Sequence, residues 1–182
     1  MEKVEVRFEP WLRQAFALYR GNFALLLLTH LVLVSVSVFT FGILAGPMFA
    51  GAARLVLDLL NGKEPKPQAG DLFKGFDYFL PSCLLGLSTL AAGVFLAAFL
   101  KPLGVLALAG PIFVATATYY AIFLIVERDL EFWPSVQASW IMARSNFWPL
   151  LGLVAFGLLA GTSGSLALGV GVVVTFPFYT CL

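Results

Sequence analysis

The chain has 182 residues, of which 60% are hydrophobic and only 12% are charged, whereas a soluble domain has roughly 45–50% and about 25%. A soluble fold of this length could not keep so much apolar surface from water, so the composition excludes an ordinary soluble domain. The formal net charge is +1, which gives no reason to expect an acidic partner or a nucleic acid.

The first predicted element is an interfacial helix that begins at Pro10. Proline suits the first turn of a helix, where its missing N–H group leaves no hydrogen bond unmade. Apolar residues follow at helical spacing on one face: Trp11, Ala15, Tyr19 and Phe23. Arg13 and Arg20 fall on other faces, which is typical of an amphipathic helix that lies in the headgroup layer of a membrane.

An elbow at Arg20-x-Asn22 is expected to turn the chain into the bilayer. We expect the Arg20 guanidinium to contact lipid phosphate and the Asn22 side chain to cap the first turn of the span. Arg144 and Asn146 form the same elbow later in the chain. The mixed charges of the first seven residues are wrong for a cleaved signal peptide, so the first membrane segment is expected to remain in the mature protein.

Six membrane-spanning helices are predicted, because a helix needs about 20 apolar residues to cross the hydrocarbon layer. Residues 21–60 provide two spans broken at Gly42 to Pro47, residues 78–100 and 102–126 provide one span each, and residues 145–182 provide two short spans broken around residues 161–164. The expected fold is therefore an all-α, integral membrane six-helix bundle with amphipathic interfacial helices.

The positions of Lys and Arg orient this bundle, because cytoplasmic loops are enriched in both. With the N-terminus in the cytoplasm, that side receives ten of the eleven basic residues, with Arg54 snorkelling toward it, and the other side receives Lys101 alone. The sequence thus predicts a multi-pass protein of a bacterial-type cytoplasmic (inner) membrane, with both termini in the cytoplasm.

An internal repeat divides the chain into related units. A shift of 124 residues superimposes Pro10 on Pro134, Arg20 on Arg144 and Asn22 on Asn146. A more degenerate copy lies between them, and a Pro-x-aromatic element recurs at Pro47, Pro111 and Pro177. We therefore predict one transmembrane domain over residues 1–182, with repeat units at about 8–62, 70–128 and 131–182, each with an interfacial helix and two spans.

Four short motifs carry a resemblance to a known group of proteins. They are the elbow at residues 20–23, the Gly46-Pro47 hairpin, the loop Asp71–Phe76 and the closing Val174–Phe178. In these the chain resembles bacterial polytopic membrane proteins of unknown function, which are similar to the membrane domain attached to some glycerophosphoryl diester phosphodiesterases. The resemblance implies a six-helix membrane fold and no catalytic residues, since the phosphodiesterase domain with its His and carboxylate cluster is absent.

His30 is the first candidate functional residue, because an ionisable group near the middle of a span is costly to bury in lipid. A metal site would need partners, and the chain has no second His. The favoured interpretation is a neutral His that is hydrogen-bonded across helices, for example to Ser35, Ser88 or Thr116. Proton handling or contact with a ligand is the alternative.

Arg54 and Asp58 lie four residues apart on the second predicted span, where opposite charges can pair within the helix. They could also snorkel to the nearby cytoplasmic surface. A satisfied pair that fixes helix packing is the favoured interpretation, and a polar conduction path is the alternative. If any residues in this chain carry function, this pair is the first choice.

Enzymatic and metal sites are not expected. Cys83 and Cys181 lie in apolar stretches without a CxxC motif and are interpreted as small buried hydrophobes. No catalytic constellation can be assembled, so neither a cofactor nor a metal is predicted. The Pro-rich segment Lys63–Gly70 is interpreted as a solvated cytoplasmic linker between the first two repeat units.

Two functional hypotheses remain after this exclusion. The first is a non-enzymatic membrane protein with a scaffold, assembly or lipid-interacting role, whose partners are membrane lipids, with a membrane-protein partner or a homo-oligomer left open. The second is a small transporter or channel-like protein with a polar path near His30, Arg54 and Asp58, because transporters place sites where helices break and repeats meet. The scarcity of charge inside the spans favours the first.

Overall fold

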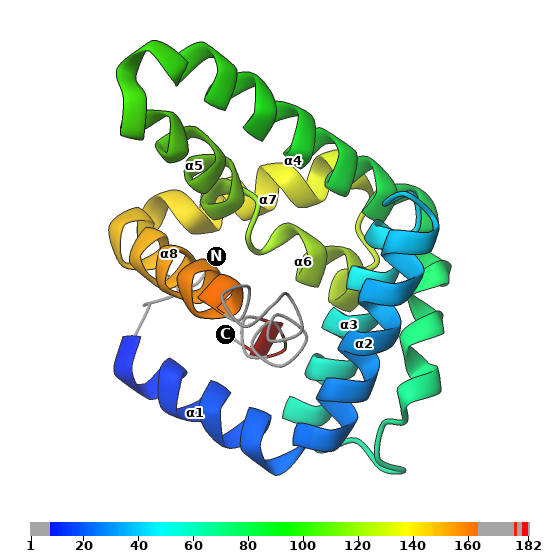
Figure 1. The fold of residues 1–182 in the computed structure, drawn as a ribbon. Coiled ribbons are helices and arrows are strands. Elements are labelled where there is room, and N and C mark those ends of the chain that lie inside the picture. The colour runs from blue at the N-terminus through cyan, green and yellow to red at the C-terminus, as the bar shows by residue number, and fades with distance from the viewer. Residues whose placement is uncertain (1–7, 164–176, 178–179, 182) are drawn as a thin grey trace.

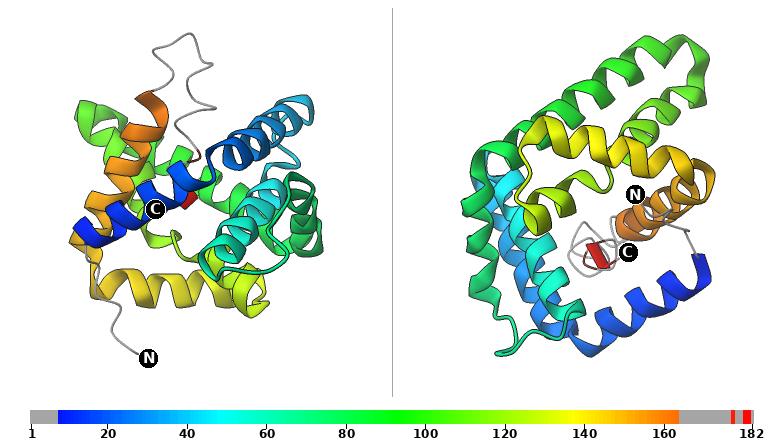
Figure 2. Two further views of the ribbon diagram at one scale, coloured as in Figure 1. Left: turned by 90° about the horizontal axis from the view of Figure 1, so that it is seen from below. Right: turned by 180° about the vertical axis from the view of Figure 1, so that it is seen from behind.

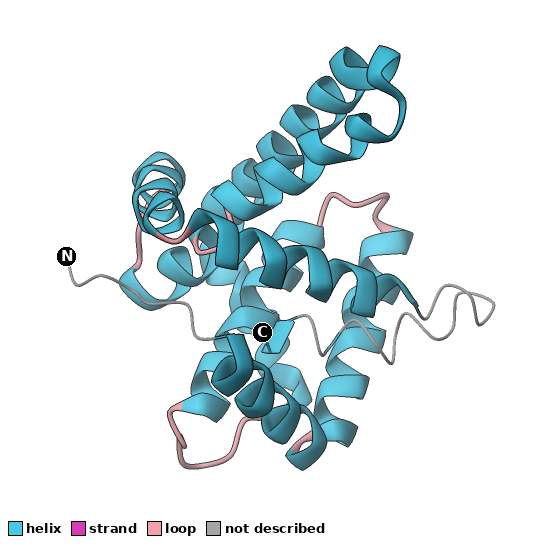
Figure 3. Cartoon of the chain, turned by 90° about the vertical axis from the view of Figure 1, so that its left-hand side faces the viewer, coloured by secondary structure: helices cyan, strands magenta, loops and turns pink. Residues whose placement is uncertain are grey.

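The computed structural model describes residues 8–163, 177 and 180–181, and every regular element in those ranges is helical. The expected all-α class is confirmed. In chain order the elements are α1 (Phe8–Gly21), α2 (Phe23–Phe39), α3 (Ala45–Leu60), the 3₁₀ helix η1 (Ala69–Tyr78), α4 (Phe79–Leu100), the 3₁₀ segment η2 (Lys101–Leu108), α5 (Ala109–Ala117), α6 (Ala121–Arg128), α7 (Phe132–Ser145) and α8 (Phe147–Ser163). Short loops join them (Figure 3).

The described helices enclose the end of the chain. In Figure 1, α1 lies below Thr180 and Cys181, α3 and α6 lie to the right of and above them, and α8 lies to the left. The view from behind in Figure 2 gives the same arrangement. Cys181 is buried in one cluster with Ala15 of α1, Leu26 of α2 and Val56 of α3. The core therefore joins the first three helices to the last described residues.

Two helices are long and apolar enough to cross a membrane, Ala69–Gly104 and Ala109–Arg128. A third span is present if α1 and α2, which are bent by 88° at the elbow, are counted as one. By length and composition, two or three described helices could therefore span a membrane, against the six spans predicted. Helix α3 has 16 residues, fewer than the about 20 needed to cross the hydrocarbon layer, and α8 is described only as far as Ser163. The predicted sixth span lies mostly outside the described residues.

The predicted break between the first two spans is confirmed, and it lies at residues 40–44, slightly before the expected position. Phe41 and Gly42 both have positive φ angles, of 50° and 83°, which end the helix in the manner of a left-handed C-terminal cap. The Gly42 N–H group donates to the Ser37 carbonyl oxygen at 2.7 Å. Phe41 is 97% exposed, so the strained turn projects from the molecule.

The fourth predicted span begins later than expected and is interrupted. Gly104 has a φ of 61° and a ψ of −120°, a conformation that glycine adopts far more easily than other residues. It allows η2 to reverse the chain, so α5 begins at Ala109 rather than at Pro102 and packs beside α4 (Figures 1 and 3). A turn at residues 118–120 then separates α5 from α6.

Glycines bring α3 and the η1–α4 segment into backbone contact. A Cβ atom added to Gly51 would overlap the Leu72 carbonyl group, and one added to Gly75 would overlap the Pro47 carbonyl oxygen. A Cβ on Gly46 would lie 2.6 Å from the Ser82 carbonyl oxygen. Small residues allow helices to approach this closely inside membranes. The result is an antiparallel helical hairpin whose first helix, α3, is largely buried.

Candidate functional sites at the elbows and buried polar residues

The two predicted elbows are single-residue breaks between consecutive helices. Asn22 separates α1 from α2 and has φ −126° and ψ 27°, and Asn146 separates α7 from α8 with φ −135° and ψ 42°. Tyr78, between η1 and α4, has a similar conformation with φ −108° and ψ 28°. Each of the three residues precedes a phenylalanine. Equivalent backbone conformations therefore occur at the start of α2, α4 and α8.

The Asn22 side chain does not cap α2, contrary to the prediction. Its Nδ2 group donates to the Leu18 carbonyl oxygen at 3.1 Å, and the α2 N-terminus receives no side-chain cap. The Leu18 carbonyl oxygen lies in the last turn of α1 and also accepts from the Asn22 N–H group at 3.1 Å, so the backbone and the side chain of Asn22 both bond to it. Asn22 thus stabilises the end of the interfacial helix and fixes the bend.

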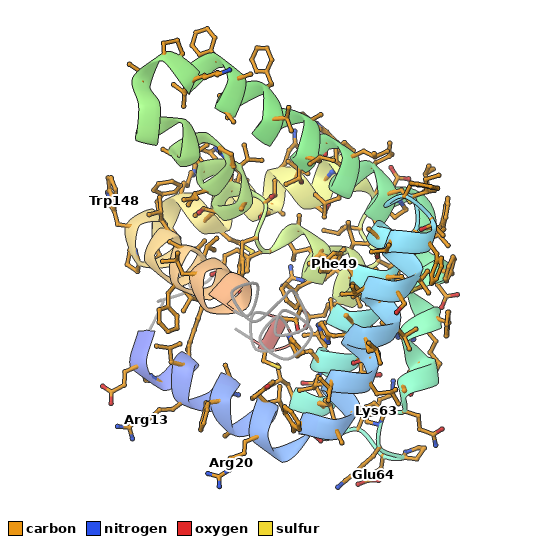
Figure 4. The ribbon with its side chains drawn as sticks, in the orientation of Figure 1. Arg13, Arg20, Phe49, Lys63, Glu64 and Trp148 are labelled. Carbon is orange, nitrogen blue, oxygen red and sulfur yellow. The ribbon has the colours of Figure 1, made fainter. Side chains whose placement is uncertain are left out.

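The arginines of the two elbows are exposed, as a role in lipid contact requires. Arg20 and Arg13 project outward from α1 (Figure 4), where Arg13 pairs with Glu9 at 2.6 Å. Arg144 is likewise exposed at the end of α7. The guanidinium groups of Arg20 and Arg144 therefore both lie at the surface.

Helix α7 has one face of small residues and one face of aromatic residues. Ser135, Ser139 and Ala143 are fully buried at a spacing of four. Trp133 and Trp140 are 60% and 40% exposed on the opposite side. Trp148, at the start of α8, is 78% exposed and points away from the molecule (Figure 4). This surface has the composition of the aromatic belts found where membrane proteins meet the headgroup layer.

Ser139 also bridges the turn between α5 and α6 through two hydrogen bonds, a role that was not predicted from the sequence. Its hydroxyl group donates to the Ala117 carbonyl oxygen at 2.8 Å and accepts from the Tyr120 N–H group at 3.2 Å. These are two of the backbone groups that the interruption frees. Satisfying such groups with a neighbouring Ser hydroxyl is what makes a helix break tolerable in a membrane.

Arg54 and Asp58 do not form the expected pair within α3. Arg54 Nη1 lies 3.3 Å from Asp77 Oδ2, and its guanidinium lies 5.9 Å from the centre of the Tyr78 ring. Asp58 instead accepts from Lys63 Nζ at 3.0 Å. The correction has a tertiary cause, because the hairpin brings η1 against α3 and offers Arg54 a partner 23 residues away.

His30 is buried, with 1% of its side chain exposed. Its Nδ1 lies 2.8 Å from the Leu26 carbonyl oxygen, so this nitrogen carries a proton. Its Nε2 lies 3.1 Å from the Thr180 hydroxyl group. The prediction of a hydrogen bond across elements therefore agrees with the structure, but this hydroxyl belongs to Thr180 rather than to the residues named from the sequence.

The three candidate polar residues are thus not brought into one site. Each has a partner of its own, and the charged pairs of α3 are partly exposed. Among the described residues, no three His, Cys, Asp or Glu side chains are grouped as a metal site would need. The linker is exposed except at the buried Pro67 and the half-buried Ala69, in keeping with the solvation expected of it.

Two cavities accompany these features. One, of about 490 Å³, lies between the start of α2 and the linker residues Lys66–Ala69. The other, of about 240 Å³, lies between α1, α3, the α5–α6 break and the end of the chain. Four of the side chains that line the second cavity are aromatic, namely Trp11, Tyr119, Tyr120 and Phe123.

Comparisons with known proteins give this chain no relatives. Neither a protein-family model, nor a curated protein, nor a solved structure matches it. Function therefore has to be inferred from the residues and their arrangement.

Proposed function

We propose that this chain is an integral protein of the cytoplasmic membrane that acts without catalysis, as a lipid-interacting scaffold or assembly subunit. The observation that carries the proposal is the exposed Trp133, Trp140 and Arg144 surface of α7, continued by Trp148. Indole rings and arginine side chains favour the headgroup layer. A surface of this kind fits a protein whose permanent partner is lipid.

The long helix α4 supports the same proposal. Its exposed side chains are large and apolar, and they run along its length: Leu80, Leu87, Leu90, Val94, Phe95 and Phe99. Each is more than 60% exposed. In water such a surface would drive aggregation, whereas in a bilayer it is matched by lipid chains.

The proposed topology has six spans in three repeat units, with both termini in the cytoplasm. Its support is that the breaks at Asn22, Tyr78 and Asn146 share one backbone conformation and precede equivalent helices. The first unit then contributes α3 and the second contributes α5 and α6. The resemblance to the membrane domain of some glycerophosphoryl diester phosphodiesterases belongs to this proposal as well.

A transporter is the second candidate, and one observation favours it. The span Ala109–Arg128 is interrupted at residues 118–120, and transporters build binding sites at interrupted helices. Against it, His30, Arg54 and Asp58 have separate partners, so the polar path that would join them has no support. The scaffold proposal is therefore preferred.

Reconstitution separates the two candidates. The chain is placed in liposomes, and the fluxes of protons, alkali cations and small organic solutes are measured beside empty liposomes. The scaffold proposal expects no flux above the empty control, and it expects Arg54→Gln and Asp58→Asn to leave that result unchanged. A flux that either substitution abolishes, in protein that stays folded, would overturn it in favour of transport.

A further inference from the structure

The cavity between α1, α3 and α6 has a lining suited to hydrocarbon. Its volume is about 240 Å³, below the range of roughly 300–1,000 Å³ typical of pockets for whole drug-sized ligands. Val56, Leu57 and Leu60 of α3 form one wall. Trp11 and Ala15 of α1 form another. A single slender group would fill it better than a whole lipid molecule.

The rings beside the helix break form the third wall. The Tyr119 ring meets the Tyr120 ring edge to face at 5.3 Å and lies 6.2 Å from the Phe123 ring. Rings held at different angles to one another leave an irregular apolar space between them. A flexible chain of methylene groups adapts to such a space more easily than a rigid planar ligand does.

Charge excludes other classes of ligand. None of the described residues that line the cavity carries a charge, and their polar side-chain groups are hydroxyls, one thiol, the Gln14 amide and the Trp11 indole N–H group. The Thr180 hydroxyl is already engaged by His30 Nε2 and the Pro177 carbonyl oxygen. An ion or a phosphate group would lose its hydration there without a charged partner. The occupant is therefore expected to be uncharged, and the aliphatic and aromatic walls favour a hydrocarbon group.

The position of the cavity identifies the source of that occupant. One wall belongs to α1, the helix proposed to lie in the headgroup layer, and Arg20 projects from this helix into the surroundings (Figure 4), whereas Arg13 is paired with Glu9. A hydrocarbon chain that enters beside α1 would leave its headgroup on the side of the molecule where the cationic Arg20 side chain attracts lipid phosphate.

We propose that this cavity binds one acyl chain of a membrane phospholipid. The inference rests on the proposed membrane function and deepens it, because it assigns the lipid interaction to a defined internal site as well as to the outer surface. The bound chain would join α1, α3 and α6 from within and would complete the packing beside the α5–α6 break.

The test uses Trp11 as a reporter. Trp133, Trp140 and Trp148 are replaced by Phe, and the protein is placed in lipid nanodiscs with a rising fraction of phosphatidylglycerol brominated on its acyl chains, which quenches nearby tryptophan. A matched variant carries Trp11→Phe and Phe16→Trp on the same background, since residue 16 is 55% exposed on the same helix and reports bulk lipid. We expect Trp11 to reach half-quenching at roughly a tenfold lower brominated fraction than residue 16.

Cavity variants identify the site. Ala15→Phe places a ring in the cavity, so the dependence of Trp11 quenching on the brominated fraction should become the same as that of residue 16. Ala17→Phe, at an exposed position of α1, should leave the quenching of Trp11 unchanged. Leu60→Phe narrows the same cavity from an exposed position and keeps the test decisive if Ala15→Phe does not fold. In native mass spectrometry of the four-tryptophan protein, one retained phospholipid is expected in the parent chain and none in Leu60→Phe.

Each remaining outcome contradicts the inference. Parallel quenching of Trp11 and residue 16 would mean that Trp11 meets only bulk lipid. An unquenched Trp11 beside a quenched residue 16 would mean a closed or otherwise occupied cavity. If neither position were quenched, the membrane proposal itself would be wrong, and the acyl-chain site would fall with it.

Discussion

At the scale of the residue, much of this fold depends on side chains that form hydrogen bonds to main-chain groups where helices end or are interrupted. The Ser139 hydroxyl bonds to two main-chain groups at the α5–α6 interruption, and the Asn22 amide adds a second hydrogen bond to the Leu18 carbonyl oxygen in the last turn of α1. Such groups are expensive to bury in an apolar environment. Both residues therefore fix the direction in which one helix follows another.

Replacing Ser139 by Ala should destabilise the protein. The Ala117 carbonyl group and the Tyr120 N–H group would lose the hydroxyl that bridges them, at a cost of roughly 1 kcal/mol in the free energy of unfolding. The measurement is reversible unfolding of the purified protein in mixed micelles. Ser145→Ala is the matched control, since Ser145 is exposed and its hydroxyl bonds only with residues near it in the chain, donating to the Met142 carbonyl oxygen and accepting from Asn146 Nδ2. Equal effects of the two substitutions would show that the bridge contributes nothing.

Asn22→Asp distinguishes the observed role of the elbow from the one that the sequence suggested. A carboxylate cannot donate to the Leu18 carbonyl oxygen and would face the negative end of α1, so we expect a loss of about 1 kcal/mol in unfolding free energy. An Asn that capped α2 would behave oppositely, because Asp is an equally good N-cap. Gln137→Glu makes the same chemical change at an exposed position in the middle of α7 and should be nearly neutral. Unchanged or raised stability of Asn22→Asp would restore the capping interpretation.

At the scale of the element, local sequence patterns predicted the helix breaks that arise from neighbouring residues. They did not predict the features that depend on tertiary contacts. The elbow at Asn22 and the break after α2 follow from residues adjacent in the chain, so they could be predicted. The pairing of Arg54 with Asp77 and the interruption at residues 118–120 depend on η1 and α7 packing against other helices. No periodicity within α3 or α5 carries that information. Helix α3, with 16 residues, is also shorter than a full span, since apolar composition does not reveal where a helix begins.

The hairpin of α3 and η1 gives the clearest prediction at this scale. Gly51→Ala places a methyl group against the Leu72 backbone and should cost about 1–3 kcal/mol of stability by forcing the helices apart. Gly86→Ala is the control, because Gly86 lies within α4 with open space around its Cα. It should be neutral or stabilising by up to roughly 1 kcal/mol through helix propensity. A tolerated Gly51→Ala would show that the close contact is not required.

The whole molecule turns large apolar side chains outward. Phe39, Phe41 and Phe99 are each more than 70% exposed, while His30 and the small side chains of α3 and α7 lie inside. Large apolar side chains such as Leu26, Met48 and Leu72 are buried as well, so the distinguishing feature is the apolar surface rather than the interior. This surface agrees with the composition of the chain and is the main support for the proposal that the molecule lies in a bilayer.

The most direct test is the environment of α4 in native-like membranes. Single cysteines are introduced at Leu80, Leu90 and Phe99 in a Cys83→Ser, Cys181→Ser background and spin-labelled, and their collision rates with oxygen and with a water-soluble nickel complex are compared. The membrane proposal predicts oxygen access that is highest at residue 90, with nickel access confined to labels near the ends of the helix. Nickel access that exceeds oxygen access along the whole of α4 would contradict it.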